Sequence, residues 1–204
     1  MELCKKKEEN CLTPYLRGAE VGDAYTYLAI KRKSFFFVCF HVGKWNDVTC
    51  DEFFEKLASR LRFPTRKRKL TIFTDGNRQN ITAIANHFHT DAIRYAQRKK
   101  IKKGQKILGI VSEKIFGNPD WGDIAINQVD GFCSKLRERI SCFTRKARSF
   151  AKRKTCIETR LEIFSVQHNF MEKKKGKTPA MREGLLSKIL DWGYILHLHL
   201  TTLK

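Results

Sequence analysis

The stretch KLTIFTDG, residues 69–76, decides the expected fold. Its centre is a run of β-branched and aromatic residues, which favours a strand buried in a sheet. The strand ends with the carboxylate of Asp75 at a glycine turn, and open α/β sheets bind ligands beyond the carboxyl ends of their strands. Asp75 is therefore a candidate metal ligand, although an aspartate before a glycine is also a common turn former.

The charge of the chain points to a polyanionic partner. The 204 residues include 41 Lys+Arg against 21 Asp+Glu, a formal net charge of +20. This excess predicts binding to nucleic acid before any other class of partner. The 42% of hydrophobic residues is enough for one sizeable core, which argues against a disordered basic tail.

The sequence predicts an intracellular protein without a membrane partner. No apolar run reaches the roughly 18 residues of a membrane span, and residues 1–7 lack the apolar core of a signal peptide. The seven cysteines are scattered and include no Cys-x-x-Cys, so neither a disulfide framework nor a zinc ribbon is indicated. We expect reduced cysteines, with Cys39 and Cys133 packed as small apolar side chains.

The residues before the Asp75 strand predict a hairpin and a helix. Residues 23–30 and 34–42 have the composition of strands, joined by a short basic link. Apolar residues at 53, 54, 57 and 61 follow one helical face, with Thr49 as a candidate N-cap. Pro64 ends that helix, and a second helix is expected over 77–88, after the Asp75 strand.

The second half of the chain is less regular. Residues 92–96 fit a short strand and residues 98–104 a basic loop, whereas the order of elements over 91–123 cannot be assigned. From residue 124 onward an apolar stripe predicts a helix, with Asp130 at the margin of its buried face. A further helix is expected to end at His168, which either packs at the helix end or approaches the functional site.

Positive charge is concentrated between residues 135 and 160, where Glu138 and Glu158 are the only acids. An exposed helix usually mixes charges of both signs, so this density favours contact with phosphates over a solvated face. The candidate DNA-binding residues are Lys135, Arg137, Arg145, Lys146, Arg148, Lys152 and Arg153.

Six short stretches of the sequence form a recognisable series: GDAYTYLAI, HVGK, FTDG, RKARSF, HNF and TPAM, at 22–30, 41–44, 73–76, 145–150, 168–170 and 178–181. In this order they resemble the DDE transposases of insertion elements of the insertion-sequence-one type, and the resemblance covers about residues 22–185. It implies an α/β fold with an RNase H-like mixed sheet flanked by helices. It also implies three acidic residues that hold two Mg²⁺ ions for DNA strand cleavage and transfer at the element ends.

The resemblance assigns the acidic residues only in part. Asp75 matches the second acid, and Asp130 matches the third, where the family has the longer Glu. The first acid has no match, because only two strands are expected before the first helix. We therefore expect an N-terminal truncation that removes the first strand, with Asp23 as a weak substitute ligand.

The expected organisation has three parts: an irregular segment over 1–20, the RNase H-like catalytic domain over 21–185, and a C-terminal helix or tail over 186–204. The expected function is that of a transposase acting on double-stranded DNA as a homo-oligomer, in the cytoplasm and associated with the nucleoid. A non-catalytic remnant or inhibitor that only binds DNA is the alternative. A basic RNA-binding accessory protein is less favoured, since Phe143 and Phe150 are the only aromatic residues in the basic segment.

Overall fold

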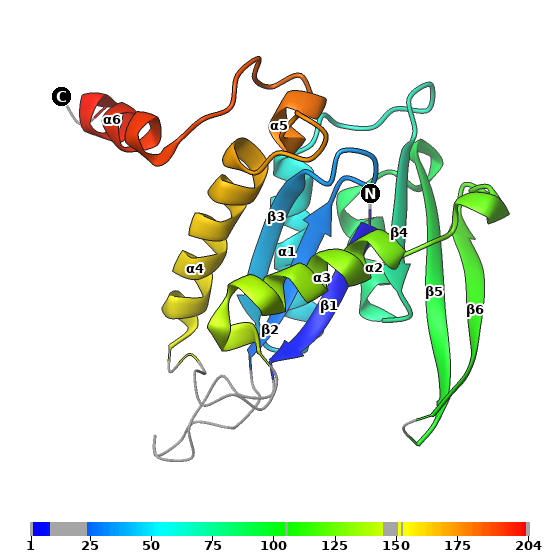
Figure 1. The fold of residues 1–204 in the computed structure, drawn as a ribbon. Helices are drawn as coiled ribbons and strands as arrows, with labels where there is room; N and C mark the ends of the chain where they lie inside the picture. The colour runs from blue at the N-terminus through cyan, green and yellow to red at the C-terminus, as the bar shows by residue number, and fades with distance from the viewer. Residues whose placement is uncertain (1, 9–23, 105, 145–150, 152, 203–204) are drawn as a thin grey trace.

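The computed structural model describes residues 2–8, 24–104, 106–144, 151 and 153–202. Its centre is a six-stranded mixed sheet in the order β3-β2-β1-β4-β5-β6, flanked by helices (Figure 1). The expected mixed α/β class is confirmed. The strands are β1 (Glu2–Glu8), β2 (Ala24–Ile30), β3 (Phe37–Gly43), β4 (Leu70–Asp75), β5 (Ile93–Lys103) and β6 (Lys106–Phe116).

Strand β1 corrects the prediction that the first strand is missing and that residues 1–20 are irregular throughout. It pairs antiparallel with β2 over Glu2–Glu8, and parallel with β4 through Glu2 opposite Phe73 and Leu3 opposite Thr74. The sequence does not predict this strand, because its segment ELCKKKE consists mainly of lysine and glutamate, which are depleted in strands. The segment is a strand because its backbone pairs with a neighbouring strand on each side.

Strands β2 and β3 form the expected antiparallel hairpin. Its turn is closed by two backbone hydrogen bonds, from Lys31 N to Phe36 O and from Phe35 N to Lys31 O, both at 2.8 Å. Phe35 has a φ of 61°, a left-handed conformation that a non-glycine residue adopts at a cost. The turn therefore needs support from elsewhere in the fold.

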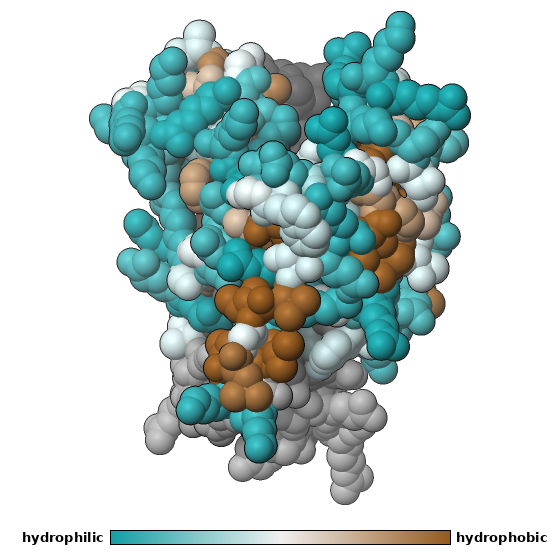
Figure 2. Space-filling model, turned by 90° about the vertical axis from the view of Figure 1, so that its right-hand side faces the viewer, coloured by the Kyte–Doolittle hydropathy of each residue, from teal (hydrophilic) through white to brown (hydrophobic). Residues whose placement is uncertain are grey.

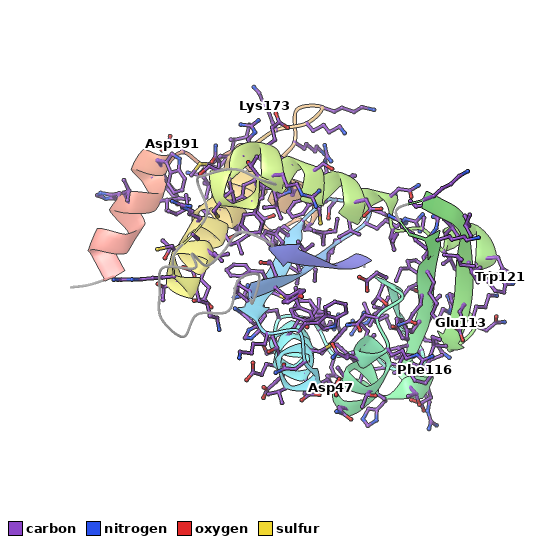
Figure 3. The ribbon with its side chains drawn as sticks, turned by 90° about the horizontal axis from the view of Figure 1, so that it is seen from below. Asp47, Glu113, Phe116, Trp121, Lys173 and Asp191 are labelled. Carbon is purple, nitrogen blue, oxygen red and sulfur yellow. The ribbon has the colours of Figure 1, made fainter. Side chains whose placement is uncertain are left out.

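Two pairs of helices cover the two faces of the sheet. Helices α1 (Asp47–Ser59) and α2 (Gln79–His87) pack on one face, and α3 (Asn127–Arg139) and α4 (Lys154–Val166) lie on the other (Figure 3). The predicted helices are thus confirmed. Each face has its own apolar core, one around Phe53, Phe54 and Ile84, the other around Phe132 and Leu136.

The first helix begins earlier than predicted. Its N-cap is Asn46, whose Oδ1 accepts a hydrogen bond of 2.9 Å from the backbone nitrogen of Thr49. Thr49, the predicted cap, instead lies buried in the first turn, against Gly43 at the end of β3. The cysteines Cys39 and Cys133 are buried as predicted, and burial raises the pKa of the Cys39 thiol to about 12.

The region 91–123, whose order of elements the sequence leaves unassigned, contains a long hairpin. The short strand predicted over 92–96 is confirmed as the first half of β5, whereas the predicted basic loop is wrong. The expected basic loop over 98–104 is the second half of β5, which pairs antiparallel with β6. Lysines have a low preference for strands, but here the backbone pairing with β6 outweighs that low preference. Gly117 directly follows β6, at the end of the hairpin that lies away from its turn, and has a φ of 63°. A Cβ there would meet Ile93 O at 2.0 Å, so only glycine fits.

The chain ends in short helical elements. Helix α4 continues into a π-helical turn over Gln167–Met171, followed by α5 (Pro179–Arg182) and α6 (Trp192–Thr202). Helix α6 confirms a helix in the C-terminal segment and stands away from the sheet (Figure 1). The remaining elements are 3-10 turns at Thr90–Ala92, Trp121–Asp123 and Ser141–Phe143. No helix within the described ranges has the length and apolarity to cross a membrane.

Candidate functional site

Asp75 ends β4, as the sequence predicts, at the turn into α2. Its Oδ1 accepts hydrogen bonds from the backbone nitrogen of Asn77 at 3.4 Å and from Nδ2 of Asn80 at 3.3 Å. Both donors belong to the turn and the first residues of α2. These contacts are those of a turn former, and metal binding by Asp75 stays a prediction.

Asp130 lies in the first turn of α3 and binds a lysine of the hairpin. The distance between its Oδ2 and Nζ of Lys100 is 3.1 Å. Both side chains are about two-fifths exposed, 42% for Asp130 and 38% for Lys100, so solvent screens this ion pair strongly. The pair ties the start of α3 to the second half of β5.

The sheet register brings Asp75 and Asp130 to the same end of β4. Asp75 lies opposite Arg98, and Lys100, which binds Asp130, follows two residues later on β5. With a rise of about 3.3 Å per residue, Lys100 lies roughly 7 Å beyond the end of β4. The two candidate acids thus share one end of the sheet, but each carboxylate is held by different partners.

The two-ion magnesium site that the family resemblance implies stays a prediction. Two ions need a carboxylate that bridges them and further oxygen ligands around each. Among the side chains that the structure describes, those of residues 24–101, 103–104, 106–144, 151 and 153–197, no three His, Cys, Asp or Glu side chains stand together as a metal-binding group. Asp23, the weak substitute ligand, lies outside the described residues.

The predicted DNA-binding residues fall into three groups. Arg145, Lys146, Arg148 and Lys152 lie outside the described residues. Arg137 and Arg153 lie in the last turn of α3 and at the start of α4, and Arg153 is exposed. Lys135 instead makes internal contacts, because its Nζ donates to a carboxylate oxygen of Glu172 and lies 2.8 Å from Nδ1 of His168.

The hairpin places further basic residues near Asp75. Arg98, Lys99 and Lys100 lie beside the end of β4, and the Cγ of Lys99 packs over Gly76, directly after Asp75. Lys99 also forms an ion pair with Glu113 on β6. The run RKKIKKGQK, residues 98–106, was the signal, but the sequence analysis took it for a loop.

His168 and Asn169 support the strained β2–β3 turn. Nε2 of His168 donates to Phe35 O at 2.8 Å, so its Nδ1 is the acceptor for Lys135. Asn169 binds both backbone groups of Phe37: Oδ1 accepts from N at 2.8 Å, and Nδ2 donates to O at 2.9 Å. These contacts explain the HNF motif as a structural clamp on the first residues of β3, the edge strand.

A cavity of about 300 Å³ opens beside this clamp, against α3. Its lining includes Phe35, Phe132, Lys135, His168, Lys174 and Arg182. Burial lowers the pKa of His168, and Lys135 adds to the effect, so the imidazole is neutral near pH 7. Burial raises the pKa of Glu172, but the hydrogen bond and charge of Lys135 outweigh it and hold that pKa below its usual value.

Comparison with known proteins assigns no family to this chain. No family model matches its sequence, and no curated protein matches it either.

Proposed function

We propose that this protein binds double-stranded DNA, as a member of the DDE transposase type with an RNase H-like sheet. The observation that carries the proposal is the arrangement of the sheet. Three antiparallel strands come first, β4 runs parallel to β1, β5 runs parallel to β4, and Asp75 lies at the end of β4. The helix with Asp130 packs on β1, on the other side of the sheet from α1 and α2.

The charge of the chain supports DNA as the partner. A formal net charge of +20 on 204 residues attracts a polyphosphate backbone whatever its base sequence. Several of the described cations are paired with acids, as Lys99, Lys100 and Lys135 are. Arg137 and Arg153, at neighbouring ends of α3 and α4, are the described members of the predicted DNA-binding set with no acid partner assigned to them (Figure 1).

Strand cleavage is a second candidate activity. It is favoured by the position of Asp75 and Asp130 at one end of the sheet, where the register of β4 and β5 places both. Against it, Asp75 is engaged by the turn into α2 and Asp130 by Lys100. Because protein groups engage both carboxylates, we propose DNA binding as the function and leave cleavage to a direct assay.

Binding is tested by fluorescence anisotropy with a labelled 30-base-pair duplex, at a series of salt concentrations. We expect log Kd to rise linearly with log salt concentration, with about 0.9 per phosphate contacted. Binding that does not change with salt would contradict the phosphate contacts. A single-stranded RNA of the same length is the control, and a clear preference for that RNA would favour the accessory-protein alternative.

Cleavage is tested on supercoiled plasmid with Mg²⁺, using the full chain. If Asp75 is catalytic, Asp75→Asn abolishes nicking, whereas Asp91→Asn has no effect, because Asp91 lies before β5 and binds Arg66 at the surface. The substitution by Asn preserves an oxygen for the turn into α2. Nicking that survives Asp75→Asn excludes this residue, and an absence of nicking beside salt-dependent binding identifies a DNA-binding protein without strand cleavage.

A further inference from the structure

Strand β6 leaves one side of its backbone available for pairing. It is the last strand in the sheet order, with β5 as its assigned neighbour. It spans Lys106–Phe116, so it is long for an edge strand. Figure 2, which looks at this side of the molecule, shows hydrophobic side chains gathered toward the lower end of the hairpin.

The exposed part of β6 is apolar and uncharged over residues 107–112. Its side chains are about half exposed: 51% for Ile107, 59% for Leu108, 48% for Ile110 and 47% for Val111. Soluble proteins usually protect an edge strand with charges, a proline, a β-bulge or a short length. Between Lys106 and Glu113 this strand has no charge and no proline, although its pairing with β5 shifts by one residue at Leu108. Its exposed apolar side chains therefore indicate a partner.

The sequence has apolar residues at matching positions on both sides of Gly109. One and two positions before it come Leu108 and Ile107, and one and two positions after it come Ile110 and Val111. Antiparallel pairing of two such strands about an axis at Gly109 places Leu108 opposite Ile110 and Ile107 opposite Val111. Lys106 then lies opposite Ser112, so no two like charges face each other.

We propose that a second copy of this chain occupies this edge, with the two β6 strands paired antiparallel about a two-fold axis at Gly109. A two-fold interface needs a surface that is complementary to itself, and the sequence around Gly109 meets that requirement. The pairing joins the two sheets into one and brings the apolar side chains of both copies into cross-strand contact.

The position of Gly109 suits an axis. A Cβ at this residue would meet no atom within 4 Å, so its surroundings are open. Across the hairpin Gly109 lies opposite Ile101, which is 48% exposed and adds a fifth apolar side chain to the patch. The pairing of β5 and β6 shifts by one residue between Ile101 and Lys102, which leaves Leu108, directly before the proposed axis, as a bulged residue of β6.

Self-pairing is favoured over insertion of this strand into DNA. A strand that contacts phosphates presents cations along its length, whereas residues 107–112 present none. The cations of β6, Lys106 and Lys114, lie outside this segment. On β5, Lys99 and Lys100 already bind Glu113 and Asp130. The proposed pairing does not depend on the proposed DNA binding, so a failure of one leaves the other standing.

The test is sedimentation velocity of the full chain at tens of micromolar, without DNA. We expect a dimer for the parent chain and a monomer for Ile107→Lys and for Val111→Glu, since each substitution places a charge within the apolar pair. The matched control is Ile163→Lys, because Ile163 on α4 is equally exposed, at 51%, and distant from β6 in the sequence. The control should remain dimeric.

A mixing experiment tests the register. When the Ile107→Lys and Val111→Glu chains are combined, the proposed pairing sets the new lysine opposite the new glutamate, and the other pair stays apolar. We therefore expect the mixture to form a dimer that neither variant forms alone. A monomeric parent chain, a dimer that persists in both variants, or a mixture that stays monomeric would each overturn the proposal, and circular dichroism checks that all chains are folded.

Discussion

The two halves of β5 belong to one strand and differ in what covers them. In the first half, Ile93, Tyr95 and Ala96 are fully buried, with Ile93 and Tyr95 in one core and Ala96 in the other. In the second half Ile101 is 48% exposed, although it is paired with β6 like the residues before it. Backbone pairing therefore forms the strand, and side-chain burial decides which half stabilises the fold.

The largest expected effect compares the two isoleucines of this strand. Ile93→Ala removes buried methyl groups and should lower the free energy of unfolding by about 2–5 kcal/mol. Ile101→Ala should change it by less than about 0.5 kcal/mol, because its side chain is half exposed. Urea unfolding followed by circular dichroism measures both, in the Val111→Glu background so that association does not contribute. Equal losses would contradict the comparison.

A smaller effect is expected from the hydroxyl of Tyr95. It lies 2.9 Å from Oγ1 of Thr74 and accepts from Nε2 of Gln97 at 2.7 Å, and both partners are buried. Tyr95→Phe leaves these groups without that partner and should lower the free energy of unfolding by roughly 1–2 kcal/mol. The control Tyr194→Phe removes a hydroxyl from a tyrosine that is 42% exposed and should have no measurable effect.

The smallest effect concerns pH, and it compares the buried clamp with the exposed hairpin. Burial lowers the pKa of His168 below its ordinary value of about 6.5, so the unfolded chain takes up a proton first as pH falls. The stability that neutral His168 provides is therefore complete above about pH 6.5 and is lost as pH falls below it. Residues 98–116 of the hairpin contain no histidine, so they add no histidine-linked change in the free energy of unfolding over this pH range.

The measurement is the urea midpoint at pH 7.5 and at pH 5.5, for the parent chain and for His168→Gln. The parent should lose stability at the lower pH, and the variant should lose less. Burial also lowers the pKa of His41, and Lys154 adds to the effect, so His41→Gln shows the share of the loss that belongs to this second residue. A loss that is the same in His168→Gln and in the parent would contradict the assignment.

The sequence predicts elements well where one residue pattern decides them. The apolar run before Asp75 predicts β4, and the stripe through Val129, Phe132 and Leu136 predicts α3, because burial of one face follows directly from the spacing. It fails at β1 and at the second half of β5, where lysines stand in strands. Those strands form because neighbouring strands pair with them, and that contact is not visible in local composition.

In the candidate site, too, the sequence predicts the position of a residue in its element but not its contacts with other elements. The sequence places Asp75 at a strand end and Asp130 at a helix margin, but it cannot show that the turn into α2 holds one and Lys100 the other. Nor does it show that Lys135 is engaged by Glu172 and His168 instead of facing outward. Each of these contacts joins residues from different elements, and only the packing of the sheet and helices decides them.

The most direct measurement of the proposed DNA binding is the salt dependence of duplex affinity for two matched double variants. Arg137→Gln with Arg153→Gln removes cations at the adjoining ends of α3 and α4, whereas Lys67→Gln with Lys69→Gln removes two exposed cations before β4, at the opposite end of that strand from Asp75. If the first pair binds phosphates, the slope of log Kd against log salt concentration falls by roughly 2, about 0.9 for each phosphate that is no longer neutralised, and the second pair leaves it unchanged. Equal slopes for the parent chain and both variants would contradict DNA binding through this surface.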